Sequence, residues 1–433
     1  FSVRIMLKKS CFVYFGLCGR SNRHIFNSAT FLKALGTSTI VTRHQNMSSS
    51  RAMDADRPFI EDVLDKYSEL NGLTMLALGS SYWSPPKKSL EKLQQLDMDV
   101  NKIHRYSNIL GLNSLRDKLK LRFQSLGLDM ATNDLIVTAG ANQAFQSTAL
   151  ALCDNGDQAI VLAPYYFSHK LALQLAGVKV SVAPFGSDML PDWDQLESLI
   201  KANKPKMVVM TSPNNPSGKV FSASDVARIV SLCRAADCWL VADQTYYEFL
   251  FDGAQHTFPE GYDKIVHIFS FSKAFGMPGW RVGYAIYPKL LTESYRKIQD
   301  TIPTHATVLS QHLAELCLDT YHEDGGRWVS DKVASLEAVR QTLWPSLETM
   351  NTVRTCGAFY FLVPLPPEVS EEEAVDVLAR KFGLLLMPGS AFGAPQHMRL
   401  SYGSIPPASA MQAEQQLRAG LQYIAELAAE RRK

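Results

Sequence analysis

From about residue 100 onward, short apolar runs alternate with segments of helical character. Helical segments such as Asn142–Cys153 and Ser224–Ala236 separate several of the runs. Apolar strands that alternate with helices are typical of a mostly parallel sheet covered by helices on both faces. The chain is therefore predicted to be an α/β protein. The predicted buried strands, in chain order, are Leu135–Ala139, Ala159–Ala163, Met207–Thr211, Trp239–Ala242, Ile265–Phe271 and Val282–Ile286.

The pattern changes after about residue 305, where longer helical periodicity predicts a second, smaller α+β domain. Its predicted helices are Gly326–Met350, Glu371–Phe382 and Ala408–Arg432, and its predicted strands are Ala358–Val363 and His397–Tyr402. We expect residues 100–305 to form the large domain and 306–433 the small C-terminal domain. Residues 54–99 precede the regular alternation and are expected to join the small domain. A chain of 433 residues is long enough for both domains.

Charge is unevenly distributed along the chain. Residues 1–53 carry eight Lys or Arg and no acidic residue, which leaves 36 basic against 42 acidic residues in the remainder. A mildly acidic body argues against nucleic-acid binding. The acid-free head resembles an organelle transit peptide, which would direct the protein to a plastid or a mitochondrion. Alternatively, residues 1–46 are untranslated upstream sequence and translation starts at Met47, which would leave the protein in the cytoplasm.

Other sequence signals are weak. No stretch approaches 18 consecutive apolar residues, so no membrane span is expected. The seven cysteines are scattered without a Cys-x-x-Cys motif, and we expect reduced thiols rather than a disulfide framework. The ten histidines show no ligand spacing, so we expect no metal site.

Three polar residues come at the ends of predicted strands. Asn215 follows the third strand, Asp243 closes the fourth, and Lys273 follows the fifth. Taken singly, each has an ordinary structural explanation, as a turn residue, a helix cap or a solvated lysine. The carboxyl ends of parallel strands meet at one edge of the sheet, where ligands of such folds bind. We therefore expect the three side chains to converge on one ligand site.

These residue types match the needs of pyridoxal 5′-phosphate (PLP). The Lys273 amine can bond to the cofactor aldehyde and, once displaced by substrate, act as a general base. Asp243 can keep the pyridine nitrogen protonated, so that the ring withdraws electrons from the substrate. Asn215 and Tyr246, the latter in Asp243-Gln-Thr-Tyr, can hydrogen-bond the ring hydroxyl oxygen. Lys273, Asp243 and Tyr246 are thus the predicted catalytic residues.

The cofactor phosphate needs hydrogen-bond donors and positive charge. The segment Thr138-Ala-Gly-Ala-Asn-Gln follows a strand and opens a helix, where free backbone N–H groups and the helix dipole favour anions. We expect the donors to come from Gly140, Ala141 and Asn142. Side chains of Ser270, Ser272 and Arg281 add hydroxyls and a fixed charge.

The motifs together resemble the class I/II aminotransferases of PLP fold type I. They are Thr138-Ala-Gly-Ala-Asn-Gln, Pro164-Tyr-Tyr, Ser212-Pro-Asn-Asn-Pro-Ser-Gly, Asp243-Gln-Thr-Tyr, Ser270-Phe-Ser-Lys, Arg281-Val-Gly and Met398-Arg-Leu-Ser-Tyr-Gly. The similarity is greatest to a plant branch that acts on aromatic amino acids and methionine. It is carried by Gly79-Ser-Ser-Tyr-Trp-Ser-Pro-Pro, the run 137–145, and Lys297-Ile-Gln-Asp-Thr-Ile-Pro.

The resemblance implies further site residues. Tyr166 would stack on the pyridine ring, and Arg399 would bind the substrate α-carboxylate through its planar fork. Gly79 would lie beside that carboxylate together with Asn215, and Trp83 would form an apolar wall of the substrate pocket. Tyr106 matches a tyrosine that reaches the phosphate of the neighbouring subunit, which implies a homodimer with shared active sites.

The predicted function is a PLP-dependent aminotransferase that moves an amino group from an L-amino acid to a 2-oxo acid by a ping-pong mechanism. An aromatic amino acid or methionine is the expected donor, as the resemblance to the plant branch implies, and aromatic residues expected near the site favour a bulky apolar side chain: Tyr82, Trp83, Tyr165 and Tyr166. We identify no second arginine in the family's pattern that would pair with a dicarboxylate side chain, which argues against strict aspartate specificity. A PLP-dependent lyase of the same fold, such as an aminocyclopropane-carboxylate synthase or a cysteine-conjugate β-lyase, remains an alternative. A PLP-sensing regulator or a catalytically silent binding protein is disfavoured, since residues 1–53 are too short for a DNA-binding module.

Overall fold

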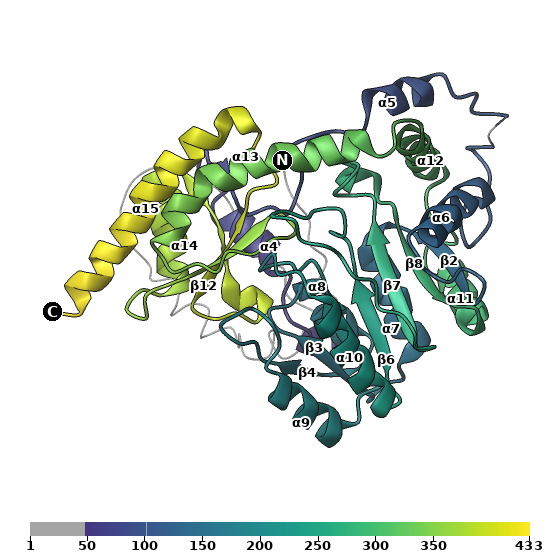
Figure 1. Cartoon of the computed structure of the whole chain (residues 1–433), viewed down its shortest axis with the longest axis horizontal. Coiled ribbons are helices and arrows are strands. Elements are labelled where there is room, and N and C mark those ends of the chain that lie inside the picture. The colour runs from purple at the N-terminus through teal and green to yellow at the C-terminus, as the bar shows by residue number, and fades with distance from the viewer. Residues whose placement is uncertain (1–47, 101) are drawn as a thin grey trace, which may run out of the picture. The chain divides into compact units, whose positions relative to one another are not determined.

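The computed structural model describes residues 48–100 and 102–433 (Figure 1). The chain divides into two compact units, residues 1–53 and residues 54–433. Most of the predicted transit peptide therefore lies outside the described residues, and its targeting role stays a prediction. The short helix α3 (Ser50–Asp54) begins the described elements.

A seven-stranded sheet forms the centre of the fold. Its strand order is β2-β8-β7-β6-β5-β3-β4, and only β8 runs antiparallel to its neighbours. The predicted, mostly parallel sheet is thus confirmed. The strands are β2 (Asn133–Thr138), β3 (Gln158–Leu162), β4 (Lys179–Ala183), β5 (Met207–Thr211), β6 (Trp239–Asp243), β7 (Ile265–Ser270) and β8 (Gly283–Pro288).

Strand β4 is the one strand of this sheet that the apolar pattern did not predict. It pairs only with β3 at the sheet edge, and most of its residues are partly or fully exposed. The other strands are buried over most of their length, which explains their continuous apolar runs. An edge strand needs no such run, so its sequence carries a weaker signal.

Helices cover both faces of the sheet, as expected. Two separate hydrophobic clusters pack on the opposite faces of the sheet. Neighbouring residues of one strand contribute to different clusters: Ile160 belongs to one and Val161 to the second. Helix α10 shows how the sequence sets a boundary, because Ser222 and Asp225 form a reciprocal capping box at its start. The helices of this region are α6 (Asn113–Ser125), α7 (Gly140–Leu152), α8 (Phe167–Leu175), α9 (Trp193–Asn203), α10 (Ala223–Ala235), α11 (Thr292–Thr301) and α12 (Val308–Glu323).

The C-terminal region has a three-stranded antiparallel sheet of order β11-β12-β9. Long helices pack beside it, and α13 extends from this region towards α12 (Figure 1). The strands are β9 (Tyr360–Pro364), β11 (Met387–Pro388) and β12 (His397–Ser401), and the helices are α13 (Arg327–Glu348), α14 (Glu371–Phe382) and α15 (Ala410–Arg431). The short 3₁₀ turns of the chain are η1 (Pro278–Trp280), η2 (Lys289–Leu291), η3 (Gly389–Phe392) and η4 (Pro407–Ser409).

The segment 54–99 contacts both regions. It contains α4 (Phe59–Lys66), β1 (Thr74–Met75) and α5 (Lys87–Gln94). Strand β1 pairs in parallel with β10 (Leu384–Leu385) of the C-terminal region. Helix α5 lies against α12, where the Ser89 and Thr320 hydroxyls are hydrogen-bonded at 2.9 Å. The exact division into domains stays a prediction.

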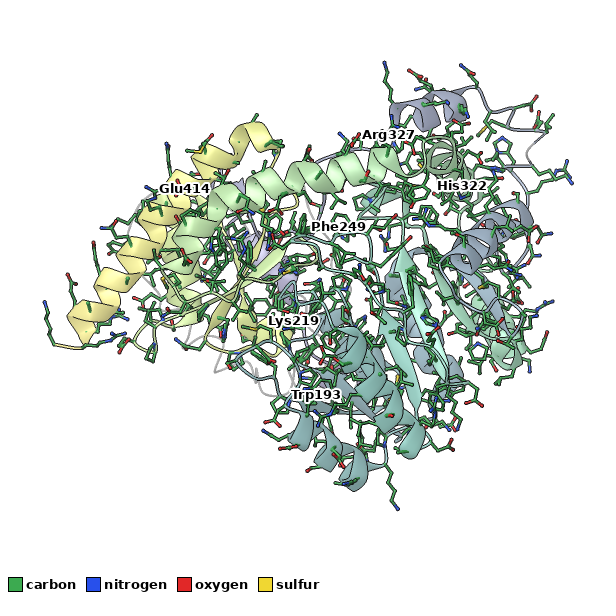
Figure 2. The ribbon with its side chains drawn as sticks, viewed as in Figure 1. Trp193, Lys219, Phe249, His322, Arg327 and Glu414 are labelled. Atoms are coloured by element: carbon green, nitrogen blue, oxygen red, sulfur yellow. The ribbon has the colours of Figure 1, made fainter. Side chains whose placement is uncertain are left out.

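The two regions meet at a buried aromatic cluster. Phe249, which follows the Asp243–Tyr246 motif, lies between the large sheet and the C-terminal elements (Figure 2). Its ring packs edge-on against Phe359 and stacks on Trp83, with centroids 5.3 Å and 6.2 Å away. Because these rings come from three separate segments, the cluster holds the strand ends of the large sheet against the C-terminal region.

Candidate active site

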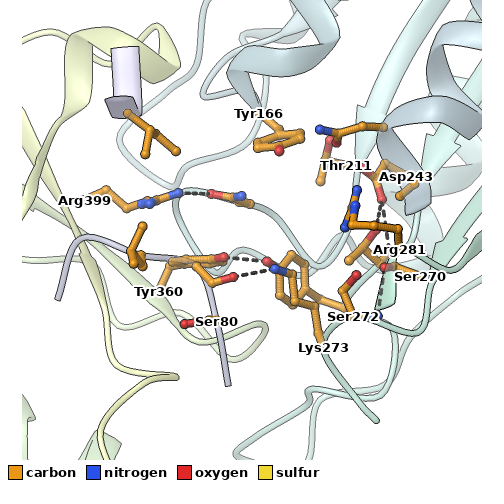
Figure 3. Close-up of a pocket in the computed structure, with 18 residues that line it drawn as sticks. Ser80, Tyr166, Thr211, Asp243, Ser270, Ser272, Lys273, Arg281, Tyr360 and Arg399 are labelled. Carbon is orange, nitrogen blue, oxygen red and sulfur yellow. Dashed lines mark hydrogen bonds between the residues drawn. The ribbon is translucent and has the colours of Figure 1, made fainter. Parts of the chain in front are cut away.

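The carboxyl ends of the central strands open on a cavity of about 290 Å³. Thr211, Asp243 and Ser270 are the last residues of β5, β6 and β7, and all three line it. Figure 3 shows Arg399 and Tyr360 at one end, Asp243, Arg281 and Ser270 at the other, and Lys273 between them. The predicted site residues in the lining are Gly79, Ala141, Asn142, Tyr166, Asn215, Asp243, Tyr246, Ser270, Ser272, Lys273, Arg281 and Arg399.

Asp243 is held as a buried carboxylate. Its Oδ2 accepts a hydrogen bond from His169 Nε2 at 3.0 Å, and its Oδ1 accepts from the Thr245 hydroxyl at 2.7 Å and backbone N–H at 3.0 Å. Burial by itself raises the pKa of Asp243, but these hydrogen bonds outweigh burial and hold the pKa below its ordinary value. The group is therefore ionised at neutral pH and suited to pair with a protonated ring nitrogen.

Lys273 lies in the middle of the cavity lining. Its Nζ donates to the carbonyl of Gly79, which belongs to the N-terminal segment. Burial, together with the positive charges of Arg399 and Arg281, lowers the pKa of the Lys273 amine to about 8. A lysine with this pKa has a substantial neutral fraction near pH 7, and only the neutral amine is a nucleophile or a base.

The first turn of α7 and the loop after β7 form the predicted phosphate end. Ala141 and Asn142 line the cavity where α7 begins, and Gly140 just precedes them with φ +83°. A Cβ at Gly140 would lie 2.5 Å from the Arg281 guanidinium, so only glycine lets that charge approach the turn. Ser270 and Ser272 face the same space. This arrangement joins free helix N–H groups, hydroxyls and a cation, which is the donor set that a phosphate requires.

Arg399 forms the opposite end of the cavity. This buried side chain on β12 donates through Nη1 to Asn215 Oδ1 at 3.1 Å and through Nη2 to the carbonyl of Ala77. Its Nε has no hydrogen-bond partner among the described residues. A buried guanidinium that still has an unpaired N–H donor is suited to bind a carboxylate ligand.

Tyr166 and Tyr246 complete the predicted ring site. Tyr166 lies at the start of α8, with its ring edge-on to His169 at 5.3 Å. The Tyr246 hydroxyl is hydrogen-bonded to the hydroxyl of Tyr360 on β9. Both tyrosines face the cavity from the large-sheet side, as the resemblance implies.

Three predicted site residues lie outside the lining. Gly140 supports the phosphate end from behind, as described above. Trp83 is buried in the aromatic cluster, where its indole donates to the Ala274 carbonyl at 3.1 Å. Tyr106 is 87% exposed and contacts the ring of His305. Neither aromatic residue lines the cavity of this subunit, and their expected roles stay predictions.

Several residues in or beside the cavity were not predicted from the sequence. His169, which bonds Asp243 from outside the lining, was detectable because it lies in the first turn of the helix that begins directly after Tyr166. Thr245 was also detectable as a short polar residue two positions after Asp243. Tyr360 stands in the run Phe359-Tyr-Phe-Leu-Val, where nothing separates it from core aromatics. The remaining lining residues that we missed are Ile60, Leu78, Ser80 and Thr211.

Comparison with known proteins shows the family of the chain. The sequence model for aminotransferase class I and II matches residues 43–413. The chain belongs to this family. Its members are PLP-dependent transaminases, so the predicted family, enzyme class and cofactor are confirmed. Among the described residues there is no cluster of three or more His, Cys, Asp or Glu that could hold a metal ion, and no helix is long and apolar enough to cross a membrane.

Individual relatives differ in the substrates that their names report. The aromatic aminotransferase ISS1 of Arabidopsis thaliana is 38% identical over 391 residues, covering 87% of this chain and 97% of that protein. The aspartate/prephenate aminotransferase of Thermus thermophilus is 30% identical over 308 residues, covering 69% of this chain and 79% of that protein. The structure of Thermus thermophilus aspartate aminotransferase with maleate has a TM-score of 0.78 at 27% identity, and covers 88% of this chain and 99% of that one. The predicted fold type I is thereby confirmed.

The residues of the cavity fit PLP. Bound there, the cofactor would carry the amino group and withdraw electrons from the substrate Cα. Asp243 would hold a proton on the ring nitrogen, while the α7 turn, the two serines and Arg281 would anchor the phosphate. Lys273 Nζ would take the proton from Cα, and Arg399 would orient the substrate by its carboxylate. Asn215 accepts a hydrogen bond from the Arg399 guanidinium and so helps to hold its orientation.

Proposed function

We propose that this aminotransferase takes its amino group from an L-amino acid with an aromatic side chain or from methionine, and passes it to a 2-oxo acid in two successive half-reactions. The observation that carries the proposal is the distribution of positive charge in the cavity. Its described lining contains three cations, Lys273, Arg281 and Arg399. Cofactor attachment, phosphate binding and the substrate α-carboxylate account for all three.

No cation of this subunit's described lining is then left for a second substrate carboxylate. A dicarboxylate such as aspartate would leave its distal charge unpaired in a partly buried site, which is unfavourable. The ring of Tyr360, by contrast, lies against the Arg399 guanidinium, and the apolar residues Ile60 and Leu78 also line the cavity. An apolar side chain would be accepted there. The name of the 38%-identical plant relative, an aromatic aminotransferase, supports the same preference.

The lyase alternative is not favoured, since the matched relatives named above are aminotransferases. It still defines the decisive experiment. We would add single amino acids to the purified holoenzyme and follow its visible absorbance band, then add a 2-oxo acid. Tryptophan, phenylalanine or methionine should abolish the band, and the 2-oxo acid should restore it. Faster loss of the band with aspartate than with these amino acids would contradict the donor assignment. Continued breakdown of the amino acid with no 2-oxo acid added would favour the lyase alternative.

We further propose that the enzyme is a homodimer with shared sites. Tyr106 is exposed at the surface, where it contacts the ring of His305. Val100, six residues before Tyr106, and Ile302, three residues before His305, are 74% and 54% exposed. A second subunit covering this surface would remove apolar area from water and could bring Tyr106 to the partner's phosphate site. The test mixes inactive Lys273→Ala subunits with Tyr106→Phe subunits. Mixed dimers should regain one intact site, whereas a Tyr106 that serves its own subunit would give no recovery.

A further inference from the structure

Tyr360 connects the two ends of the cavity. Its hydroxyl is hydrogen-bonded to that of Tyr246, and its ring lies below the Arg399 guanidinium, with Cζ 4.9 Å from the ring centroid. The register of β9 and β12 places Leu362 opposite Arg399, so Tyr360 projects from the same face of this small sheet. Figure 3 shows Tyr360 beside Arg399 at one end of the cavity, with Lys273 nearby.

The position of the Tyr360 hydroxyl is closely defined. A Cβ at Gly79 would lie 2.3 Å from this oxygen, so the backbone that accepts the Lys273 hydrogen bond packs directly against it. Tyr360 and Tyr246 are both buried, and their rings meet at 83° with centroids 5.4 Å apart. Such packing leaves the phenol little freedom to rotate away.

The hydrogen bond between the two phenols has a direction. Each hydroxyl carries one proton, and one of them must donate to the other. If Tyr246 gives its single proton to the ring oxygen of the cofactor, the proton between the two phenols must come from Tyr360. Burial raises the pKa of both phenols, so both carry their protons at neutral pH. The other titratable groups that act on the pair are Tyr166 and Asp243, and Lys273 lines the same cavity.

We propose that Tyr360 is a positioning residue that donates its phenolic proton to Tyr246 and thereby directs the Tyr246 proton at the ring oxygen of the cofactor. A hydroxyl that accepts one hydrogen bond becomes a stronger donor in the next. The chain Tyr360–Tyr246–ring oxygen would therefore withdraw negative charge from that oxygen. This inference rests on the proposed role of Tyr246 at the ring oxygen.

The test measures the pKa of the visible absorbance band of the bound cofactor, with no substrate present. Charge on the ring oxygen favours protonation of the cofactor–lysine linkage, so weaker donation by Tyr246 raises this pKa. We expect Tyr246→Phe to raise it by about one pH unit and Tyr360→Phe by roughly 0.3 pH units. In the Tyr246→Phe background, Tyr360→Phe should have no further effect.

The sign of the shift decides between the possible outcomes. A downward shift in Tyr360→Phe would mean that Tyr246 had been donating to Tyr360, and no shift would mean that the pair is not coupled to the cofactor; either overturns the inference. If Tyr246→Phe itself leaves the chromophore pKa unchanged, Tyr246 does not donate to the ring oxygen. The positioning role of Tyr360 is then also wrong. If only Tyr360→Phe is without effect, the assignment of Tyr246 stands.

Two further variants guard against a purely structural effect. Tyr402→Phe removes a buried phenol that follows β12 and contacts the Ala358 carbonyl at 3.4 Å, outside the cavity lining. It should leave the chromophore pKa unchanged. Should Tyr360→Phe be unstable, replacing Tyr360 with a fluorinated tyrosine preserves the shape and makes the phenol a stronger donor. That variant should lower the chromophore pKa, and an unchanged or raised value would contradict the proposal.

Discussion

The two ends of the active-site cavity are built in different ways. At the cofactor end, Asp243 and Ser270 terminate adjacent parallel strands, and Lys273 follows three residues after Ser270. At the substrate end, Arg399 on β12 binds the carbonyl of Ala77 from the N-terminal segment and Asn215 from the large sheet. The residues named at the first end all terminate or follow strands of one sheet. The second end forms only when three distant parts of the chain meet. We therefore expect the geometry of the substrate end to change more readily than that of the cofactor end.

The largest expected effect concerns the cofactor end. Lys273→Ala removes the amine predicted to bind the cofactor and to move the Cα proton, and activity should fall by about 10⁴-fold or more. The visible band of the holoenzyme should also disappear. Lys264→Ala is a matched control at the opposite end of β7, where Lys264 pairs with Asp237 at 2.6 Å. Equal losses in both variants would show that the effect is structural.

Asp243→Asn should have the next largest effect, a fall in kcat of roughly 10³-fold. The amide keeps the size of the side chain but cannot hold a proton on the ring nitrogen by charge. Single-turnover kinetics with a good donor would measure the loss directly. Asp237→Asn, just before the other end of β6, is the control and should be nearly neutral, because that carboxylate is 83% exposed.

The substrate end should respond mainly in binding. Arg399→Lys keeps the charge but loses the planar fork, and we expect KM for the amino acid to rise about 10²-fold with a smaller change in kcat. The pKa of the cofactor band without substrate should change little. The control is Arg354→Lys, which makes the same substitution outside the cavity lining. Its steady-state KM should stay close to that of the unchanged enzyme. A kcat loss as large as that of Asp243→Asn would mean that the two ends do not act separately.

The smallest effect is a pH dependence. The pKa of Lys273 is lowered to about 8, so its neutral fraction rises with pH until about 8 and then levels off. After removal of the cofactor, the rate at which the apoenzyme takes up PLP should therefore rise about tenfold per pH unit below pH 7 and become flat above pH 9. Stopped-flow absorbance would measure this rate of PLP uptake. A rate that keeps rising to pH 10 would indicate a lysine with an ordinary pKa.

Much of the cofactor end could be predicted from the sequence. Buried parallel strands have continuous apolar runs, and the residue after each run lies at the ligand-binding edge of the sheet. Asp243 and Lys273 could thus be placed near each other without coordinates. Edge strand β4 was not predicted, because its exposed residues interrupt the apolar pattern. Arg399 and Gly79 were identified through family motifs alone, since no local pattern relates residues more than 300 positions apart.

By itself, the sequence determined the α/β fold, the edge of the sheet where the cavity lies and the chemical types of the residues expected to hold the cofactor. All of these follow from local periodicity and from the order of strands. Only the tertiary structure decided that Gly79 meets Lys273, that Asn215 fixes Arg399 and that Tyr360 meets Tyr246. These contacts depend on how the C-terminal region packs against the strand ends. Packing of that kind is set by the shapes of side chains from the whole core, and no local stretch of sequence encodes it.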